Sequence, residues 1–162
     1  MRNVVVVDAS IALKWVLRES DSNTAFALLT EWNDREAMLL VPALLAYEIA
    51  NGLYRKARSG EITLNRAKEA LAEVLLAGLQ FDFSSDLALS MRAIELADQY
   101  DLSATYDSHY LALAEREGCE FWTADTKMWR AIRGKLPWVR WLDDYVPANS
   151  DTSPNASDPN NS

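Results

Sequence analysis

The chain has 162 residues, a formal net charge of −8 and one cysteine. Its length suits one domain with a sizeable core, and a lone cysteine excludes an internal disulfide. No apolar run approaches the ~20 residues that cross a bilayer, and the start lacks signal-type features, so we expect a cytoplasmic protein without membrane contact. The acidic balance argues against tight, nonspecific DNA binding. It still allows a nuclease that meets phosphates through metal ions and local basic patches.

Short apolar segments predict the strands. The first contains four consecutive valines, a pattern typical of a strand buried on both faces of a parallel sheet. The third segment, at 80–83, could be a strand or only a link. The expected strands are residues 4–7, 37–41, 80–83, 119–123 and 138–142.

Apolar stripes and capping residues predict helices between these strands. Pro42 suits the first turn of a helix, while Gly60 and Gly118 each follow the end of one. The expected helices are residues 10–18, 23–35, 42–58, 63–77, 84–97, 105–117 and a short basic segment from 126.

The alternation of strands and helices predicts an α/β domain with a mostly parallel sheet covered on both faces. We place this domain at residues 1–146. Residues 147–162 are mainly Pro, Asn, Ser, Asp and Thr, so we expect a disordered polar tail.

Two aspartates stand directly after predicted strands. Asp8 follows the valine strand, and Asp125 follows the strand at 119–123. Ligands of open α/β sheets bind outside the carboxyl ends of the strands, so both carboxylates lie where a site is expected. For Asp125, capping of the following helix is an alternative role.

Two further acids fall on helix faces that should point inward. Glu48 lies four residues after Leu44 and four before Gly52, within an apolar stripe. Asp107 shares a face with Leu111. A buried, unpaired carboxylate becomes protonated or finds a cation. The alternatives are that Glu48 sits at the edge of its stripe, near water, and that Asp107 interacts with the dipole of its own helix.

Four such carboxylates would need a metal. Two of them ~4 Å apart repel by about 4 kcal/mol at an effective dielectric constant of 20. Mg²⁺ and Mn²⁺ prefer oxygen ligands and accept phosphate oxygens of a substrate. An oxygen-only site therefore predicts phosphate-ester chemistry, in which one metal can activate a water and a second can stabilise the leaving oxygen.

Two basic stretches could contact nucleic-acid phosphates. Solvated helix faces are an equally plausible role for both. The first contains Lys127, Arg130, Arg133, Lys135 and Arg140, and the second contains Arg55, Lys56 and Arg58.

Other side chains are less informative. His109 is two residues from Asp107, so it faces away from it on a helix, and we expect a surface or interface residue rather than a general base. Tryptophans are expected in the core or at interfaces, although Trp129 and Trp138 could stack on bases.

At these residues the sequence resembles the PIN-domain ribonucleases, specifically the VapC-type toxins of bacterial toxin–antitoxin pairs. The order and separation of the matching segments fit that family from about Val4 to Leu142. Ser108 departs from it, since a small apolar residue is commoner there, and the tail is additional. The matching segments are residues 7–10, 42–51, 106–115 and 123–125.

The resemblance implies a three-layer α/β/α fold and Mg²⁺- or Mn²⁺-dependent endonucleolytic cleavage of RNA. It also implies a homodimeric toxin inhibited by a cognate antitoxin protein. Metal ligands or acids of the metal shell are implied at Asp8, Glu48, Asp107 and Asp125. Supporting roles are implied at Ser10 and Thr123, which would hydrogen-bond the acids or metal waters, and at Asn51, near the glutamate.

Three other functions remain as alternatives. A Mg²⁺-binding phosphoacceptor signalling domain would have paired acids after its first strand, where Asp8 stands alone. A phosphatase with an aspartate nucleophile would have a second acid two residues later, where this chain has Ser10. A non-catalytic interaction domain would have no need of four intact acids.

Overall fold

The central sheet of the protein is entirely parallel. The computed structural model describes residues 3–84 and 87–147, and in this part of the chain the strand order is β3-β2-β1-β4-β5. Every adjacent pair is parallel, which confirms the predicted mostly parallel sheet. The strands are β1 (Val4–Val7), β2 (Met38–Pro42), β3 (Gln80–Asp82), β4 (Glu120–Thr123) and β5 (Val139–Trp141).

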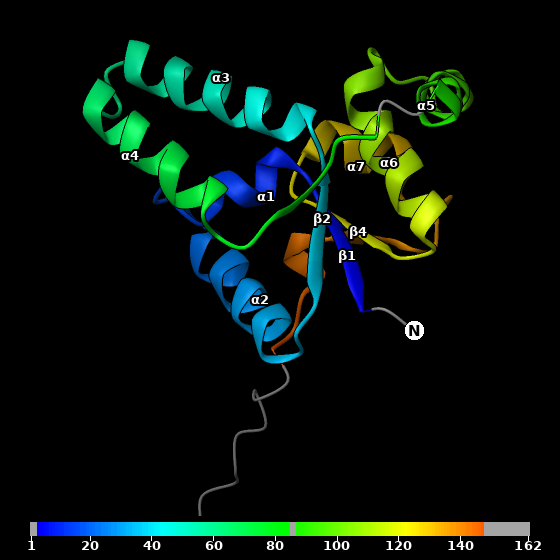
Figure 1. The fold of residues 1–162 in the computed structure, drawn as a ribbon, viewed down its shortest axis with the longest axis horizontal. Coiled ribbons are helices and arrows are strands. Elements are labelled where there is room, and N and C mark those ends of the chain that lie inside the picture. Colours follow the sequence, from blue (N-terminus) through cyan, green and yellow to red (C-terminus); the bar gives the residue numbers. More distant parts are fainter. Residues whose placement is uncertain (1–2, 85–86, 148–162) are drawn as a thin grey trace, which may run out of the picture.

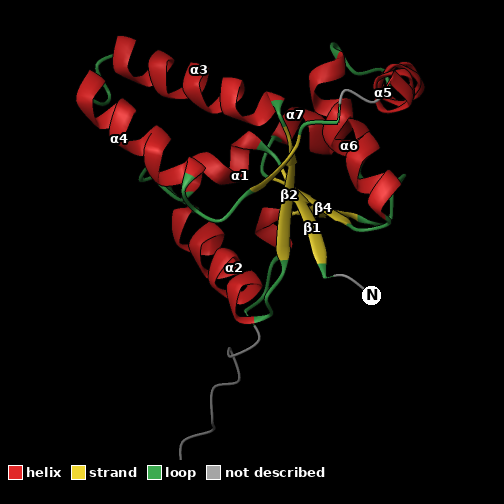
Figure 2. Ribbon diagram, in the orientation of Figure 1, coloured by secondary structure: helices red, strands yellow, loops and turns green. Residues whose placement is uncertain are grey.

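Helices cover both faces of this sheet. Helices α1 to α4 lie on one side, and α5, α6 and α7 lie on the other (Figures 1 and 2). The predicted three-layer α/β/α arrangement is therefore confirmed. The helices are α1 (Ala9–Lys14), α2 (Ser22–Asp34), α3 (Leu44–Arg58), α4 (Leu64–Leu75), α5 (Leu87–Gln99), α6 (Thr105–Glu117) and α7 (Thr126–Ile132), followed by the 3₁₀ turn η1 (Leu142–Asp144).

The chain reverses direction across the sheet after β3. From β1 it moves outward through β2 to β3, then crosses back to β4 beside β1 and continues to β5. Right-handed crossovers therefore put the early helices on one face and the late helices on the other. Such a reversal creates a crevice at the carboxyl ends of β1 and β4, where open α/β sheets bind ligands.

The core joins the valine strand to helices on both faces. Val6 and Val7 are fully buried, as the valine run predicted. On α3, Leu45, Ile49 and Leu53 recur every four residues and are buried, which fixes the side of this helix that faces the core. The middle of α6 is buried over five consecutive residues, 110–114, so this helix is covered on all sides.

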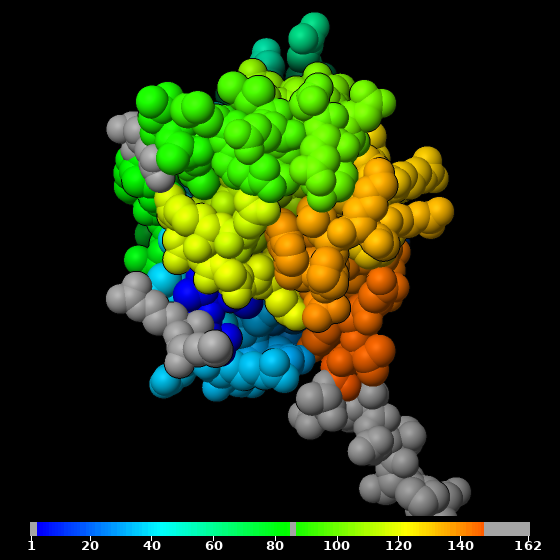
Figure 3. All heavy atoms as spheres, turned by 90° about the vertical axis from the view of Figure 1, so that its right-hand side faces the viewer, coloured from blue at the N-terminus to red at the C-terminus, as the bar shows by residue number. Residues whose placement is uncertain are grey.

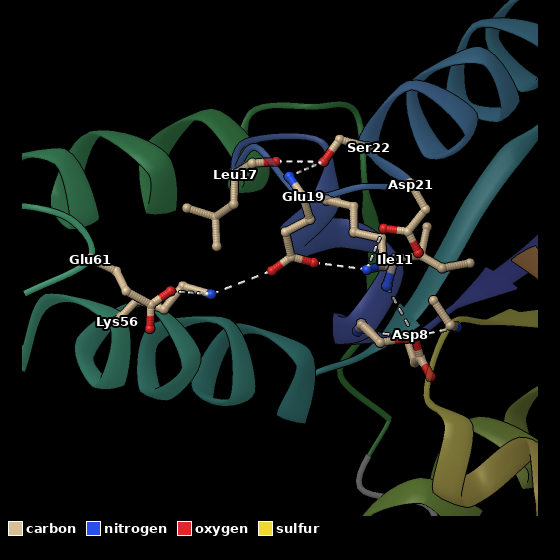
Figure 4. Close-up of polar contacts among 11 residues, drawn as sticks. Asp8, Ile11, Leu17, Glu19, Asp21, Ser22, Lys56 and Glu61 are labelled. Atoms are coloured by element: carbon tan, nitrogen blue, oxygen red, sulfur yellow. Dashed lines mark hydrogen bonds and ion pairs between the residues drawn. The ribbon is translucent and has the colours of Figure 1, made fainter. Parts of the chain in front are cut away.

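Two predicted boundaries were wrong. The helix expected at 10–18 ends at Lys14, because the Ser22 hydroxyl bonds the backbone beyond it (Figure 4): it accepts from Glu19 N at 2.9 Å and donates to Leu17 O at 2.7 Å. Pro42 ends β2 instead of starting α3, which begins at Leu44. Proline lacks the N–H that a longer strand would donate.

The remaining expectations differ little from the structure. Residues 80–82 are a strand rather than a link. The predicted start of the helix at 84–85 partly falls on residues 85–86, which lie outside the described residues, as does the tail from 148 onward. No helix in the described ranges is long and apolar enough to cross a membrane.

Candidate metal centre

Asp8 occupies the carboxyl end of β1 and caps α1. Its Oδ1 accepts hydrogen bonds from Ser10 N at 3.0 Å, Ser10 Oγ at 2.5 Å and Ile11 N at 3.3 Å. Its Oδ2 accepts from Thr123 Oγ1 at 2.5 Å. The side chain is 6% exposed, and this burial raises the carboxyl pKa to about 6, although the hydrogen bonds oppose the shift. Asp8 is therefore a rigidly held, desolvated carboxylate.

Ser10 and Thr123 link the ends of the two central strands. While both hydroxyls donate to Asp8, Ser10 Oγ also accepts from Ala124 N at 2.8 Å, and Thr123 Oγ1 accepts from Asp125 N at 3.0 Å. Each hydroxyl thus has both a donor and an acceptor role. The network fixes the loop after β4 relative to Asp8.

Asp125 begins α7 as its N-cap, so the capping role considered from the sequence is real. Its Oδ1 accepts from Met128 N at 2.8 Å. Within the described ranges, the second carboxylate oxygen has no hydrogen bond. One oxygen therefore orients the side chain while the other stays available for a ligand.

Glu48 reaches the site from α3. Its side chain is half-buried. This lies between the two roles considered from the sequence, a side chain pointing into the core and one at the edge of the apolar stripe near water. The Tyr110 hydroxyl of α6 donates a hydrogen bond to Glu48 Oε2. Burial raises the pKa of Glu48 to about 7, and repulsion from Asp8, Asp107 and Asp125 adds to the shift, whereas the Tyr110 bond lowers it. Glu48 is thus positioned by a partner on the opposite helical layer.

Tyr110 is a site residue that sequence reasoning missed. It is 1% exposed, and burial together with the nearby Glu48 carboxylate raises the pKa of its phenol far above the ordinary value. Tyr110 follows Asp107 by three residues, so the two share a helix face. That spacing was the available signal, but it gives no indication that Glu48 is the partner.

Asp107 lies in the first turn of α6, without a capping hydrogen bond. The N-cap position of this helix is Ala104. In the described part of the chain, no group donates a hydrogen bond to the half-buried Asp107 carboxylate. Burial raises its pKa, repulsion by Asp125 adds to the shift, and the Lys127 charge opposes it. Hydrogen bonding within the described residues therefore does not explain why a carboxylate is half-buried at this position.

The four acids line one cavity at the carboxyl ends of β1 and β4. Its volume is about 230 Å³. They arrive from four separate segments: two strand ends, α3 and α6. The lining is Asp8, Ala9, Ser10, Glu48, Asn51, Gly52, Arg55, Asp107, Tyr110 and Asp125.

The donor set has the chemistry of a site for a hard divalent cation. All four acids offer oxygen, and Asp8, Glu48 and Asp107 have raised pKa values because burial and mutual repulsion disfavour their charges. In the described ranges, however, no three Asp, Glu, His or Cys side chains are arranged to hold a metal ion as they stand. Cation binding would therefore require these side chains to turn toward a common point.

The basic candidates differ in their distance from this cavity. Arg55 is part of its lining, whereas Lys127 donates to Ser103 Oγ at 2.7 Å, and Arg130 and Arg133 are exposed at α7. Arg140 pairs with Glu120. Of the basic candidates, only Arg55 belongs to the cavity lining, although the charge of Lys127 acts on Asp107.

The histidine and the tryptophans lie outside the cavity lining. His109 Nδ1 is 2.6 Å from Thr105 O, so the ring contacts its own helix. Trp129 stacks on Trp141, with ring centroids 5.6 Å apart, and Trp138 is half-buried. These contacts are structural.

Comparison with known proteins identifies the family. The sequence profile of the PIN domain matches residues 5–135. Ribonuclease VapC3 of Pyrobaculum aerophilum is 29% identical over 129 residues, which cover 76% of this chain and 91% of that protein.

Solved structures show the same fold at lower identity. PAE2754 from Pyrobaculum aerophilum has a TM-score of 0.60 at 21% identity, covering 88% of this chain and 93% of that one. A toxin–antitoxin complex from Klebsiella pneumoniae has a TM-score of 0.60 at 18% identity, covering 85% and 97%. Together with the profile match over most of the sequence, these likenesses confirm the predicted resemblance: the chain belongs to the PIN domain family.

Proposed function

We propose that this protein is a Mg²⁺- or Mn²⁺-dependent endoribonuclease that acts as the toxin of a type II toxin–antitoxin system. The observation that carries the proposal is the convergence of Asp8, Glu48, Asp107 and Asp125 on one cavity at the sheet's reversal point. No lysine or arginine neutralises Asp8 or Glu48 through an ion pair within the described ranges. A divalent cation is the counter-charge that such a site lacks.

In this proposal the four carboxylates hold the metal, and the neighbouring groups position them. A divalent cation held by Asp8, Glu48, Asp107 and Asp125 would supply Lewis acidity and would make a nearby water a better nucleophile toward phosphorus. Ser10 and Thr123 fix Asp8, and Tyr110 fixes Glu48. Asn51 lies on the cavity wall one helical turn after Glu48, where its amide can orient water or substrate.

The toxin assignment rests on relatives. Ribonuclease VapC3 is a ribonuclease by name, and the Klebsiella pneumoniae structure is a complex of a toxin with its antitoxin. VapBC2 of Rickettsia felis, which shares the fold at a TM-score of 0.57 and 14% identity, is bound to a DNA fragment from its promoter. We infer a cytoplasmic enzyme that a cognate antitoxin protein inhibits.

We also propose a homodimer formed through α5, the helix spread across the surface in Figure 3. Leu87, Met91 and Ile94 recur at intervals of four and three residues, and their exposed fractions are 74%, 54% and 60%. A twofold axis would bury this stripe against its own copy. Ile94→Glu should convert the dimer to a monomer in sedimentation velocity, whereas a monomeric wild type at all concentrations would contradict the assignment.

The test of the enzymatic proposal is cleavage of total bacterial RNA in Mg²⁺ or Mn²⁺, with EDTA as the control. Asp8→Asn, Glu48→Gln, Asp107→Asn and Asp125→Asn should each lose most activity while remaining folded. Because the four acids serve one site, a double variant should lose little more than a single one.

Two results would overturn the metal mechanism. One is cleavage that survives EDTA, and the other is normal cleavage by the carboxylate variants. Phosphorylation of Asp8 by a small phosphodonor, without RNA cleavage, would support the signalling or phosphatase alternative instead.

A further inference from the structure

A basic groove adjoins the acidic cavity along α3. Its volume is about 650 Å³, and it shares Gly52 and Arg55 with the lining of the acidic cavity. The two hollows are therefore neighbours on one helix surface. The groove is lined by Leu13, Gly52, Arg55, Lys56, Arg58, Ser59 and Glu61.

The helix itself aligns the two sites. Arg55 follows Glu48 by seven residues, which is two turns and about 10 Å along the axis. Arg58 follows Arg55 by three residues, so the two guanidinium groups can project from one face. The surface of α3 therefore changes from acidic to basic along the direction that leads away from the site.

Gly52 lies in the lining of both hollows. A Cβ atom at this position would lie 3.0 Å from Leu13 Cδ1. Any larger residue would have to displace the Leu13 side chain, and it would stand where the two linings meet. The close contact between Leu13 of α1 and Gly52 of α3 therefore lies where the linings of the two hollows meet.

Internal ion pairs occupy one cation of the groove but not two others. Lys56 bonds Glu61 at 2.8 Å and lies 3.5 Å from Glu19 (Figure 4). The guanidinium groups of Arg55 and Arg58, in contrast, form no hydrogen bond or ion pair within the described residues, and both side chains are exposed. Helix-dipole stabilisation explains why basic residues occur in this last turn, but it does not explain why Arg55 also lines the cavity of the four acids.

We infer that Arg55 and Arg58 bind successive backbone phosphates of the RNA strand as it leaves the metal centre. This inference rests on the proposed ribonuclease function and assigns the path of its substrate along α3. RNA is a polyanion, so the four carboxylates repel every phosphate except the one at the metal. The unpaired cations next to that cavity supply the compensating attraction. From the sequence alone, both basic stretches were equal candidates for this role.

The experiment compares pairs of charge removals. Arg55→Gln/Arg58→Gln is the test variant, and Arg130→Gln/Arg133→Gln tests the competing stretch. Arg35→Gln/Lys68→Gln is the matched control, since it removes two exposed positive charges that line neither hollow. Glutamine favours helix as arginine does, and melting curves verify that each variant folds.

The probe is a labelled single-stranded RNA 12-mer of random sequence, titrated by fluorescence anisotropy at several salt concentrations in EDTA, so that metal-dependent cleavage does not consume it. Each lost phosphate contact should make the slope of log K against log salt shallower by about 0.7, so the test variant should lose about 1.4 and the control nothing. Arg55→Lys/Arg58→Lys retains both charges and should restore most of the slope. In cleavage assays the test variant should raise KM several-fold with kcat nearly unchanged.

The outcomes separate this inference from the proposed function. If the wild type cuts RNA but the test variant keeps its full slope, or if only Arg130→Gln/Arg133→Gln loses it, the inference alone is wrong. If Arg55→Gln/Arg58→Gln keeps the salt slope but binds the cognate antitoxin more weakly, the groove binds a protein partner. That result would also overturn the inference. If the wild type neither binds nor cuts RNA, both proposals fail.

Discussion

Replacing Asp8 with asparagine should have opposite effects in the absence and presence of metal. The pKa of Asp8 rises from 3.8 to about 6 mainly because the carboxyl is buried. Above pH 6 the folded, metal-free protein therefore holds a charge that costs about 3 kcal/mol relative to the unfolded chain. Asparagine removes this cost and remains a good N-cap for α1.

The gain will be smaller than that limit because an amide cannot accept at both positions. Either Thr123 Oγ1 or the Ser10 and Ile11 donors must face the NH₂ group instead of an oxygen. We expect a net gain of about 1–2 kcal/mol, and at about 2–4 °C per kcal/mol the melting temperature should rise by about 2–8 °C in EDTA. With Mg²⁺ at a hundred times its Kd, the wild type should instead gain about 2.7 kcal/mol, and the variant little.

The pH dependence of stability provides an independent comparison of the wild type with Asp8→Asn. A carboxyl whose pKa is higher in the folded state contributes stability below the unfolded value, and this contribution is lost as pH rises through the folded value. The free energy of unfolding of the metal-free wild type should therefore fall between pH 4 and pH 6–7. Asp8→Asn lacks this carboxyl, so its free energy of unfolding should not show that part of the decrease. Thermal melts of both proteins across this range measure the difference. Equal destabilisation of Asp8→Asn with and without Mg²⁺, or equal Mg²⁺ stabilisation of both proteins, would refute the reasoning.

Three further predictions concern groups around the site and the tail. Tyr110→Phe removes the bond that lowers the pKa of Glu48, so the acidic limb of the pH–rate profile should move to higher pH with the fold retained; an unmoved limb would mean that this bond does not tune the site. His109→Ala should keep most RNA cleavage, because its ring contacts Thr105 O and is not part of the cavity lining, and an inactive variant would count against this assignment. Truncation from Ala148 should leave the melting temperature and cleavage unchanged, as expected for a nuclease domain at 1–146, unless the tail serves the fold or the substrate.

The sequence predicted the positions of the site acids through topology. Four valines indicated a strand buried on both faces, and helices after each strand indicated parallel neighbours. In a parallel sheet the carboxyl ends share one edge, so Asp8 and Asp125 could be placed together without coordinates. The strand pairing of Val7 with Trp122 then brings their loops side by side.

Contacts between distant helices could not be predicted in this way. Helical periodicity shows which face of α3 contains Glu48, but it does not show that Tyr110 of α6, 62 residues away, is the side chain opposite. The end of α1 was missed for the same reason. The residues up to Arg18 are compatible with helix, and the backbone turns earlier because the Ser22 hydroxyl satisfies the groups around Leu17 and Glu19.

The capping roles of Asp8 and Asp125 also determine which substitutions can be interpreted. In each residue, Oδ1 bonds backbone N–H groups at the start of a helix, so the carboxylate is both a candidate metal ligand and a local structural element. Alanine would remove both functions, and loss of the cap alone costs about 1 kcal/mol. Asparagine keeps one oxygen that can accept for the cap, and it removes the charge and the second acceptor. Loss of activity in the asparagine variants would therefore reflect the carboxylate's role in the site, because α1 and α7 would still be capped.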